Sequence, residues 1–346
     1  MNWEKSPQEH KFTSTGIKFW RHQEALESYR AGTGRSIIST HISPEGACNL
    51  KCPYCSVTHR DTHQRIALPV VKRYVEDLQS RGLKAVILTG GGEPTIYKHF
   101  NELVQWIKGR GLQVALITNG TQAQRVEAAT WACFSWVRVS LNVFAGWEQK
   151  IRIPFHLLSP DCTVGCSMVY GRAHDHDLTK LRTASQVATA NGAAYVRVLP
   201  DCMLPQEQLI EQHHELNAAF AEIGDARFFH QHKLHAAPNC GTCHQSYFRP
   251  YLSEVVSTES GEPGTVFPCD SVVLNGQAQH FPQLYQLCPA SKILDYMDRK
   301  RVAGFTPSKH CSGCVFTSNV EMLDRWKNQG GYSMFSSTPL HDENFV

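Results

Sequence analysis

Short apolar runs alternate with amphipathic segments along this chain, and this alternation constrains the fold more than any other feature. Runs typical of buried strands occur at 36–42, 85–88, 114–117, 136–141, 163–170 and 195–199. Segments typical of helices follow them, near 70–78, 99–109, 122–132, 144–150, 176–191 and 206–222. Strands that alternate with helices of this length predict right-handed crossovers and a parallel sheet. Six units are too few to close an eight-stranded barrel, so we expect an α/β fold with a partial (β/α)6 barrel.

A loop with three cysteines follows the first expected strand. Cys48, Cys52 and Cys55 are spaced Cys-x3-Cys-x2-Cys, and the aromatic residue Tyr54 precedes the last of them. Three thiolates on one short loop can bind three corners of an iron–sulfur cube, and the local sequence offers no fourth ligand. One iron would then stay open for a small molecule. For this motif taken alone, a zinc loop or buried free cysteines are the alternatives.

Glycines and polar residues follow the next expected strands. The second strand leads into Gly91, Gly92 and Glu93, the third into Asn119, and the fourth ends near Ser140 and Asn142. In a parallel barrel the loops after the strands carry the chemistry, so these residues are expected around one mouth together with the cysteines. Glycines let the backbone approach a ligand, and a carboxylate can bind an ammonium group. A plain tight turn is the alternative for the glycine run, and for Asn119 a residue that tolerates the turn.

The cysteine triad with Tyr54, the Gly-Gly-Glu sequence at 91–93 and the Thr-Asn-Gly turn at 118–120 resemble the motifs of the radical SAM enzymes. The resemblance covers roughly residues 36–222. It implies a [4Fe–4S] cluster on Cys48, Cys52 and Cys55 whose open iron binds the amino and carboxylate groups of S-adenosylmethionine (SAM). It also implies that several further residues contact SAM, with the methionyl amino group held at 91–93: Tyr54, Gly91, Gly92, Glu93, Asn119, Ser140 and Asn142.

Two arginines interrupt strands that are otherwise apolar. Arg138 lies on the fourth expected strand and Arg197 on the sixth. A buried arginine needs an anionic partner, because leaving it unpaired is costly. The carboxylate of SAM, a substrate anion or a structural salt bridge would serve. We expect Arg197 to belong to the site, among the cofactor-binding residues.

The last third of the chain is irregular and rich in cysteine. It contains Cys240-x2-Cys243, Cys269, Cys288 and Cys311-x2-Cys314. Two Cys-x2-Cys pairs can form a zinc site. The Gly-x-Val-Phe-Pro-Cys sequence at 264–269, a helix at 291–297 and the final pair instead resemble the SPASM or twitch extension of radical SAM enzymes. That resemblance implies one auxiliary [4Fe–4S] cluster on Cys243, Cys269, Cys311 and Cys314, with Cys240 or Cys288 as substitutes.

The 346 residues, 42% of them hydrophobic, suffice for a large and a small domain. We expect an N-terminal strap or lid (1–35), the partial barrel (36–225), the auxiliary-cluster domain (226–327) and a flexible tail (328–346). Thirteen cysteines, with no secretory signal at the start, predict a reducing cytoplasm and metal ligation in place of disulfides. No stretch approaches the ~18 apolar residues of a membrane span, so no membrane partner is expected.

The resemblance implies an enzyme whose reduced cluster passes one electron to SAM. Methionine and a 5′-deoxyadenosyl radical result, and the radical abstracts a hydrogen atom from the substrate. An external one-electron donor of the flavodoxin or ferredoxin type is then required. Enzymes with this extension often modify peptides, so a peptide or amino-acid residue is the expected substrate, and a nucleotide or a base of DNA or RNA is the alternative. A non-catalytic iron–sulfur electron carrier is the rival class, but it needs neither a glycine-rich SAM site nor a six-unit barrel.

Overall fold

The computed structural model describes residues 5–141, 153–171, 177–233, 240–275, 280–298, 311–329 and 340–346. One ten-stranded sheet runs through it in the order β10-β9-β8-β1-β2-β3-β4-β5-β6-β7. Each of the first six strands pairs in parallel with the next. Their bounds are β1 Ser39–Ile42, β2 Ala85–Leu88, β3 Gln113–Thr118, β4 Phe134–Ser140, β5 Thr163–Tyr170 and β6 Tyr195–Pro200.

These six strands confirm the expected partial barrel, and the sheet continues beyond them at both ends. Strand β7 (Phe228–His230) pairs in parallel with β6, and β8 (Tyr251–Val256) pairs in parallel with β1. Strands β9 (Pro263–Phe267) and β10 (Cys288–Pro289) then add in antiparallel fashion. Since β7 and β10 stand at opposite ends of the strand order, the sheet described here is open.

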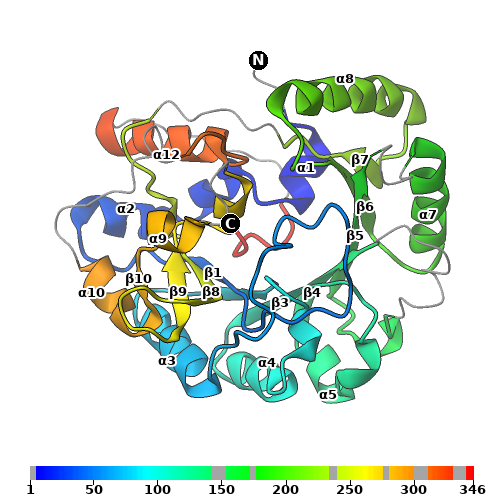
Figure 1. Cartoon of the computed structure of the whole chain (residues 1–346). Helices are drawn as coiled ribbons and strands as arrows, with labels where there is room; N and C mark the ends of the chain where they lie inside the picture. Colours follow the sequence, from blue (N-terminus) through cyan, green and yellow to red (C-terminus); the bar gives the residue numbers. More distant parts are fainter. Residues whose placement is uncertain are drawn as a thin grey trace.

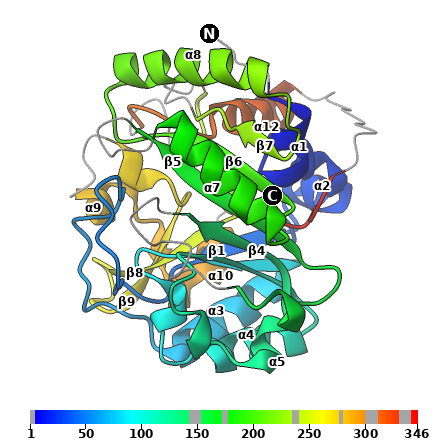
Figure 2. The ribbon, with the colours of Figure 1, turned by 90° about the vertical axis from the view of Figure 1, so that its right-hand side faces the viewer.

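Helices cover the outer face of the parallel strands (Figure 1, Figure 2). They are α3 (Leu68–Ser80), α4 (Phe100–Gly109), α5 (Ala128–Trp131), α7 (Leu178–Ala190) and α8 (Gln206–Ile223). The segment expected to be helical near 122–132 forms only the short η3 (Ala123–Arg125) and α5, and the segment near 144–150 lies outside the described residues. Within the described ranges, no helix has both the length and the hydropathy to cross a lipid bilayer.

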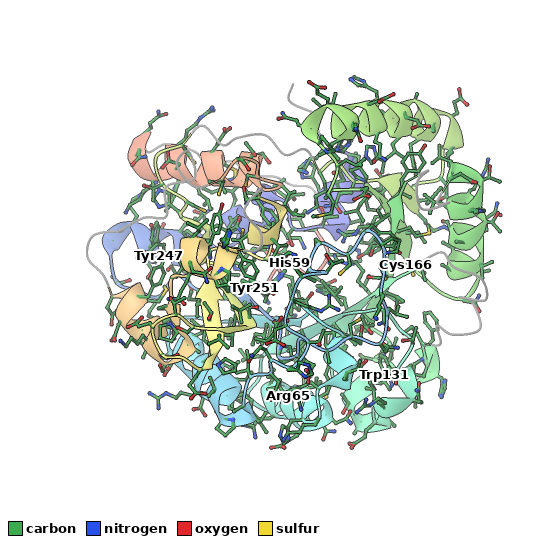
Figure 3. The ribbon with its side chains drawn as sticks, viewed as in Figure 1. His59, Arg65, Trp131, Cys166, Tyr247 and Tyr251 are labelled. Carbon is green, nitrogen blue, oxygen red and sulfur yellow. The ribbon has the colours of Figure 1, made fainter. Side chains whose placement is uncertain are left out.

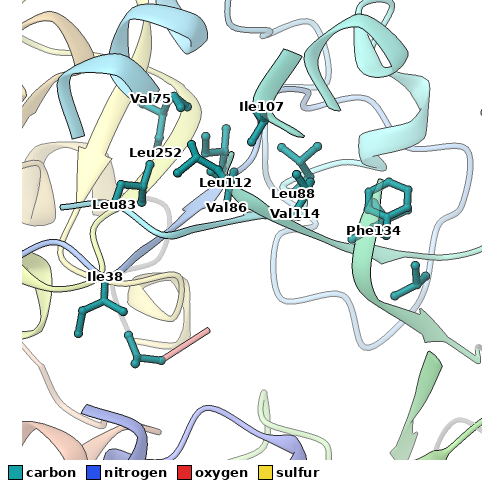
Figure 4. Packing of buried hydrophobic residues seen from close by; sticks show 14 of the residues in the cluster. Ile38, Val75, Leu83, Val86, Leu88, Ile107, Leu112, Val114, Phe134 and Leu252 are labelled. Atoms are coloured by element: carbon teal, nitrogen blue, oxygen red, sulfur yellow. The ribbon is translucent and has the colours of Figure 1, made fainter. Parts of the chain in front are cut away.

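The main core lies between the sheet and these helices (Figure 4). Val86 and Leu88 of β2 pack in it with Val75 of α3 and Ile107 of α4, and all four are fully buried. Side chains alternate along a strand, so Ile87 points to the inside of the barrel, where it belongs to a separate apolar cluster. Each fully buried aliphatic side chain contributes roughly 1.5–3 kcal/mol. The sheet is therefore held to its helices by apolar packing, and its polar loops are free to form a site.

The N-terminal segment packs against the end of the chain. It contains α1 (Pro7–Phe12), η1 (Gly16–Arg21) and α2 (Gln23–Ala31). The indole of Trp20 meets that of Trp326 in α12 (Thr317–Gln329), with 6.2 Å between the ring centroids. Phe19 and Leu26 are buried in the main core, so the strap forms part of the same packed structure.

Residues 340–346 fill the inside of the barrel, and the chain end lies in the middle of the ring of strands (Figure 1). The ring of Phe345 packs edge-on against Trp136 of β4, with centroids 5.4 Å apart. The buried ammonium of Lys18 donates to the carbonyl oxygens of Asp342 and Phe345. These residues belong to the segment expected to be a flexible tail, yet Phe345 is only 2% exposed.

Replacing Phe345 by Ala should lower the free energy of unfolding by about 3–5 kcal/mol, because it leaves a cavity beside Trp136. Urea denaturation followed by tryptophan fluorescence measures this change. Phe155→Ala is the matched control, since Phe155 is 38% exposed, and it should cost less than about 1 kcal/mol. Equal losses in the two variants would mean that residues 340–346 do not fill the barrel in solution.

Candidate functional site

Two backbone hydrogen bonds join the cysteine loop to the glycine-rich loop after β2. The amide of Glu93 donates to the carbonyl of Ala47 at 2.8 Å, and the amide of Gly92 donates to the carbonyl of Glu45 at 2.9 Å. A Cβ atom on Gly92 would lie 1.9 Å from the Ala47 oxygen, so only glycine permits this approach. The two loops that carry the predicted cluster ligands and SAM contacts are therefore one unit.

The three cysteines of the first loop are half-buried and interact with one another. Burial raises the pKa of Cys48, and burial together with the neighbouring Cys55 and Cys48 raises that of Cys52 to about 11. The sulfur of Cys48 accepts from the amide of Leu50 at 3.5 Å. Three thiolates at this spacing repel one another unless a cation lies between them. The donor set thus suits a bound iron–sulfur cluster, whose irons supply that positive charge.

Arg60 fixes the shape of the cysteine loop, and sequence reasoning did not single it out. Its Nε donates to the carbonyl of Gly46 and its Nη1 to that of Val57, both at 2.8 Å. The same Nη1 lies 3.5 Å from the sulfur of Cys55. An arginine five residues after a cysteine triad forms no sequence motif, so this contact is evident only in the folded structure.

Glu93 is 3% exposed and connects the ends of β2 and β3. Its Oε1 accepts from the hydroxyls of Thr118 at 2.6 Å and Thr95 at 2.7 Å, and its Oε2 accepts from the amide of Asn119 at 2.8 Å. Burial raises the pKa of Glu93, and these hydrogen bonds act in the opposite direction. Oε2 accepts one of these bonds and can accept another, so the carboxylate can still bind an ammonium group.

Asn119 connects the third strand to the cysteine loop. Its Nδ2 donates to Oδ1 of Asn49 at 3.0 Å and lies 3.9 Å from the sulfur of Cys48. Ser140 ends β4 opposite Ser167 of β5 and is half-buried. Asn142, expected to contact SAM, lies outside the described residues.

Tyr54 and Arg197 lie on different elements, the cysteine loop and strand β6. Tyr54 stays on the cysteine loop, hydrogen-bonded to Cys52, and Asp201 beyond β6 also acts on it electrostatically. Arg197 is buried on the inner face of β6, where its guanidinium donates to Oε1 of Gln231. The cysteine loop after β1 therefore reaches toward the end of β6.

Five of the C-terminal cysteines come together and a sixth does not. Cys240 and Cys243 are buried beside Phe316 and Val320, with Cys269 and Cys314 packed against them. Cys311 interacts electrostatically with Cys314 and Cys240. Cys288, expected as a substitute ligand, instead lies in the main core, opposite Val266 of β9.

Backbone amides donate to most of these clustered sulfurs. Cys314 accepts from the amide of Phe316 at 3.3 Å, and Cys240, Cys243 and Cys269 each bond to the amide two residues later. Cys48 makes the same type of bond to Leu50. Amide–sulfur bonds stabilise thiolates and tune iron–sulfur clusters. Among the described residues, no three His, Cys, Asp or Glu side chains converge closely enough to hold a single metal ion.

One aromatic cluster connects the two cysteine sites. It is built from Tyr251, Phe267, Val272, Val273, Phe281 and Tyr285. Val57 of the cysteine loop packs against it, and so do Cys269 and Cys311. The ring of the exposed His59 lies 6.3 Å from that of Phe281, and Figure 3 labels His59 near Tyr251 of the same cluster. The C-terminal region is thus packed directly against the loop that carries Cys48, Cys52 and Cys55.

Curated proteins resemble part of this chain. One, an S-adenosylmethionine-dependent nucleotide dehydratase of Selenomonas ruminantium, is 32% identical over 84 residues, which cover 24% of this chain and 30% of that protein. A probable GTP 3′,8-cyclase of Pyrococcus horikoshii is 32% identical over 127 residues, covering 36% of this chain and 41% of that protein. The matches thus span less than half the length of either relative.

A solved structure and a family model also match this chain. SuiB of Streptococcus suis, bound to its precursor peptide SuiA, superposes with a TM-score of 0.50 at 13% identity, over 74% of this chain and 65% of that one. At this identity the likeness establishes the fold alone. Residues 42–153 match the model of the Radical SAM superfamily. This range contains the cysteine loop and the glycine loop joined to it, so this part of the chain is similar to the radical SAM superfamily.

Proposed function

We propose that this protein is an enzyme that cleaves SAM reductively and abstracts a hydrogen atom from its substrate. The observation that carries the proposal is the hydrogen-bonded junction at Ala47 and Glu93, which brings three cysteines beside a glycine loop at the mouth of a partial barrel. When bound, the cluster and SAM supply a 5′-deoxyadenosyl radical, a species that no amino-acid side chain can generate.

The residues of the chain bind and orient these groups. Cys48, Cys52 and Cys55 would hold three irons. Glu93 would bind the amino group of SAM, and Thr95 and Thr118 hold the carboxylate of Glu93 in place. The space beside Gly91 and Gly92 is taken by Glu254 and by the Ala47 carbonyl, so these glycines would contact SAM through their backbone. Tyr54, Asn119, Ser140 and Asn142 complete the proposed contacts around it.

The five clustered cysteines support a second, auxiliary [4Fe–4S] site. Cys243, Cys269, Cys311 and Cys314 are the proposed ligands, and Cys240 is the fifth cysteine within the same group. Their amide–sulfur bonds match the one at Cys48. Zinc is the alternative occupant.

The substrate class has two candidates. A peptide or amino-acid residue is the one that the SPASM or twitch resemblance favours. A nucleotide is the second, supported by the names of the relatives and by buried cations inside the barrel, which are described below. The matches cover 24% and 36% of this chain, so the relatives' own substrates do not transfer directly to it. A flavodoxin- or ferredoxin-like protein is the proposed electron donor.

Replacing Cys48 by Ala should abolish SAM cleavage, since the cluster would lose one of its three ligands. Anaerobic reconstitution, reduction with dithionite and quantification of 5′-deoxyadenosine measure this. Cys166→Ala, which alters a buried core cysteine on β5, is the matched control and should still cleave SAM. Undiminished cleavage in the Cys48 variant contradicts the assignment, and a wild-type protein that never cleaves SAM supports the electron-carrier alternative.

Glu93→Gln should weaken SAM binding about tenfold, because a charge-assisted hydrogen bond to the amino group is lost. Iron content should stay nearly intact, since the carboxylate contacts threonines and a backbone amide and no sulfur. Calorimetric titration with SAM and iron analysis measure the two quantities. Glu102→Gln, on the exposed surface of α4, is the control. If the Glu93 variant loses iron together with SAM affinity, Glu93 has a structural role instead.

A variant with Cys48, Cys52 and Cys55 all replaced by Ala should still bind about four irons at the auxiliary site. Adding Cys269→Ala should remove them, because Cys269 is a proposed ligand. Adding Cys288→Ala should not, since Cys288 lies in the main core. Iron and zinc analysis after anaerobic reconstitution distinguishes the two metals. One zinc and no iron in the triple variant would overturn the auxiliary-cluster proposal.

A further inference from the structure

Several cations face the inside of the barrel. Arg138 of β4 and Arg197 of β6 lie on inward-facing positions, because Trp136 and Tyr195, two residues earlier on each strand, line the inner cavity next to Phe345. Lys233, three residues beyond β7, interacts with Arg197 electrostatically. Strands β4 and β6 and the segment after β7 thus direct positive charge toward the same interior space.

The carboxylate of Asp270, which acts electrostatically on Arg138, Arg197 and Lys233, is already paired with Arg249 and lies beside His41. Asp270 lies 3.3 Å from Arg249 and 3.3 Å from His41. Burial raises the pKa of Asp270, but His41 and Arg249 lower it more, so that it stays well below its usual range. Among the ion pairs within 4.0 Å formed by the described residues, none involves Arg138, Arg197 or Lys233.

The two arginines keep unused hydrogen-bond donors. Arg197 is 9% exposed, and it donates from Nη1 to Gln231, but its Nε has no partner. Arg138 lies over the ring of Trp136, 5.3 Å from the centroid, and its Nε also has no partner. Burial, and then Arg138, lowers the pKa of Arg197 to about 9, a sign that the two cations repel each other. A buried guanidinium without an anionic partner lowers stability, so binding of an anion beside these arginines would be favourable.

Within the described residues, side chains near these cations keep part of their surface exposed at the ends of the strands. Inward-facing residues near the ends of the strands are only half-buried, namely Arg138, Ser140, Val169, Leu199 and Lys233. On the other side, residues 340–346 leave a cavity of about 30 Å³ next to Arg138, which holds little more than one water molecule. A ligand therefore has to enter from the mouth.

We propose that Arg138, Arg197 and Lys233 bind an oxyanionic group of the substrate, either a phosphate or a carboxylate. The proposal rests on the proposed function and names the chemistry of its substrate. Arg138 comes two residues before Ser140, so its backbone lies about 6.6 Å deeper in the barrel than the proposed SAM contact. A substrate anion at that depth would sit beneath SAM, with the reacting carbon between the anion and the mouth.

Titration of the reconstituted, SAM-loaded protein with inorganic phosphate and, separately, with acetate tests this site. Anaerobic calorimetry should detect binding of at least one anion, and the preferred one identifies the substrate group. Affinity should fall about tenfold or more in Arg197→Gln and in Lys233→Gln. Arg197→Lys keeps the charge and should bind more tightly than Arg197→Gln. Arg73→Gln, on the exposed face of α3, is the control and should match the wild type.

Three results would overturn the proposal. The first is that neither anion binds. The second is that Arg197→Gln and Lys233→Gln, with their circular dichroism and iron content intact, bind the anion as the wild type does. The third is that the anion binds only without SAM, which would assign the cations to the SAM carboxylate. If Arg197→Gln does not fold, Lys233→Gln and Arg197→Lys decide the outcome. Failure of the wild type to cleave SAM is measured separately and concerns the proposed function alone.

Discussion

The close approach of two backbone segments, at Ala47 and at Gly92, is the constraint on which the rest of the site depends. The approach requires a glycine, because a Cβ atom would lie 1.9 Å from the carbonyl oxygen of Ala47. It also sets the position of Glu93, whose carboxylate then binds the amide of Asn119 on the following loop. Asn119 in turn lies beside the sulfur of Cys48. Three loops from three adjacent strands are thereby fixed relative to one another.

Electrostatics gives the two halves of the site opposite characters. At the mouth, the cysteine thiols and the buried carboxyl of Glu93 become negative when they lose their protons. They can then bind metal ions and an ammonium group. One layer deeper, Arg138 and Arg197 concentrate positive charge, and neither forms an ion pair with a carboxylate among the described residues. SAM at the mouth and an anionic substrate beneath it would together balance both. The aromatic cluster around Phe267 also connects the two cysteine sites, so the C-terminal region supports the wall of the first site.

The sequence predicted the six parallel strands well, because strands buried on both faces appear as continuous apolar runs. Strand β7 was missed since Phe228–His230 is too short to give a pattern, and β8 because polar residues interrupt Tyr251–Val256. Motif spacing identified the cysteine triad, but no local pattern links Arg60 to it. The convergence of Cys240 with the other four cysteines, and the separation of Cys288, depend on contacts between distant segments. Composition suggested a loose tail, whereas a single aromatic side chain, Phe345, packs its end into the barrel.

The central claim is that SAM binds directly beside the triad of Cys48, Cys52 and Cys55. Electron paramagnetic resonance of the reduced, reconstituted protein, recorded with and without SAM, tests it most directly. A variant with Cys269 replaced by Ala isolates the signal of the first cluster from that of the auxiliary site. SAM should change the g values of the reduced cluster, because SAM would bind the open iron. A signal that is identical with and without saturating SAM would contradict the account.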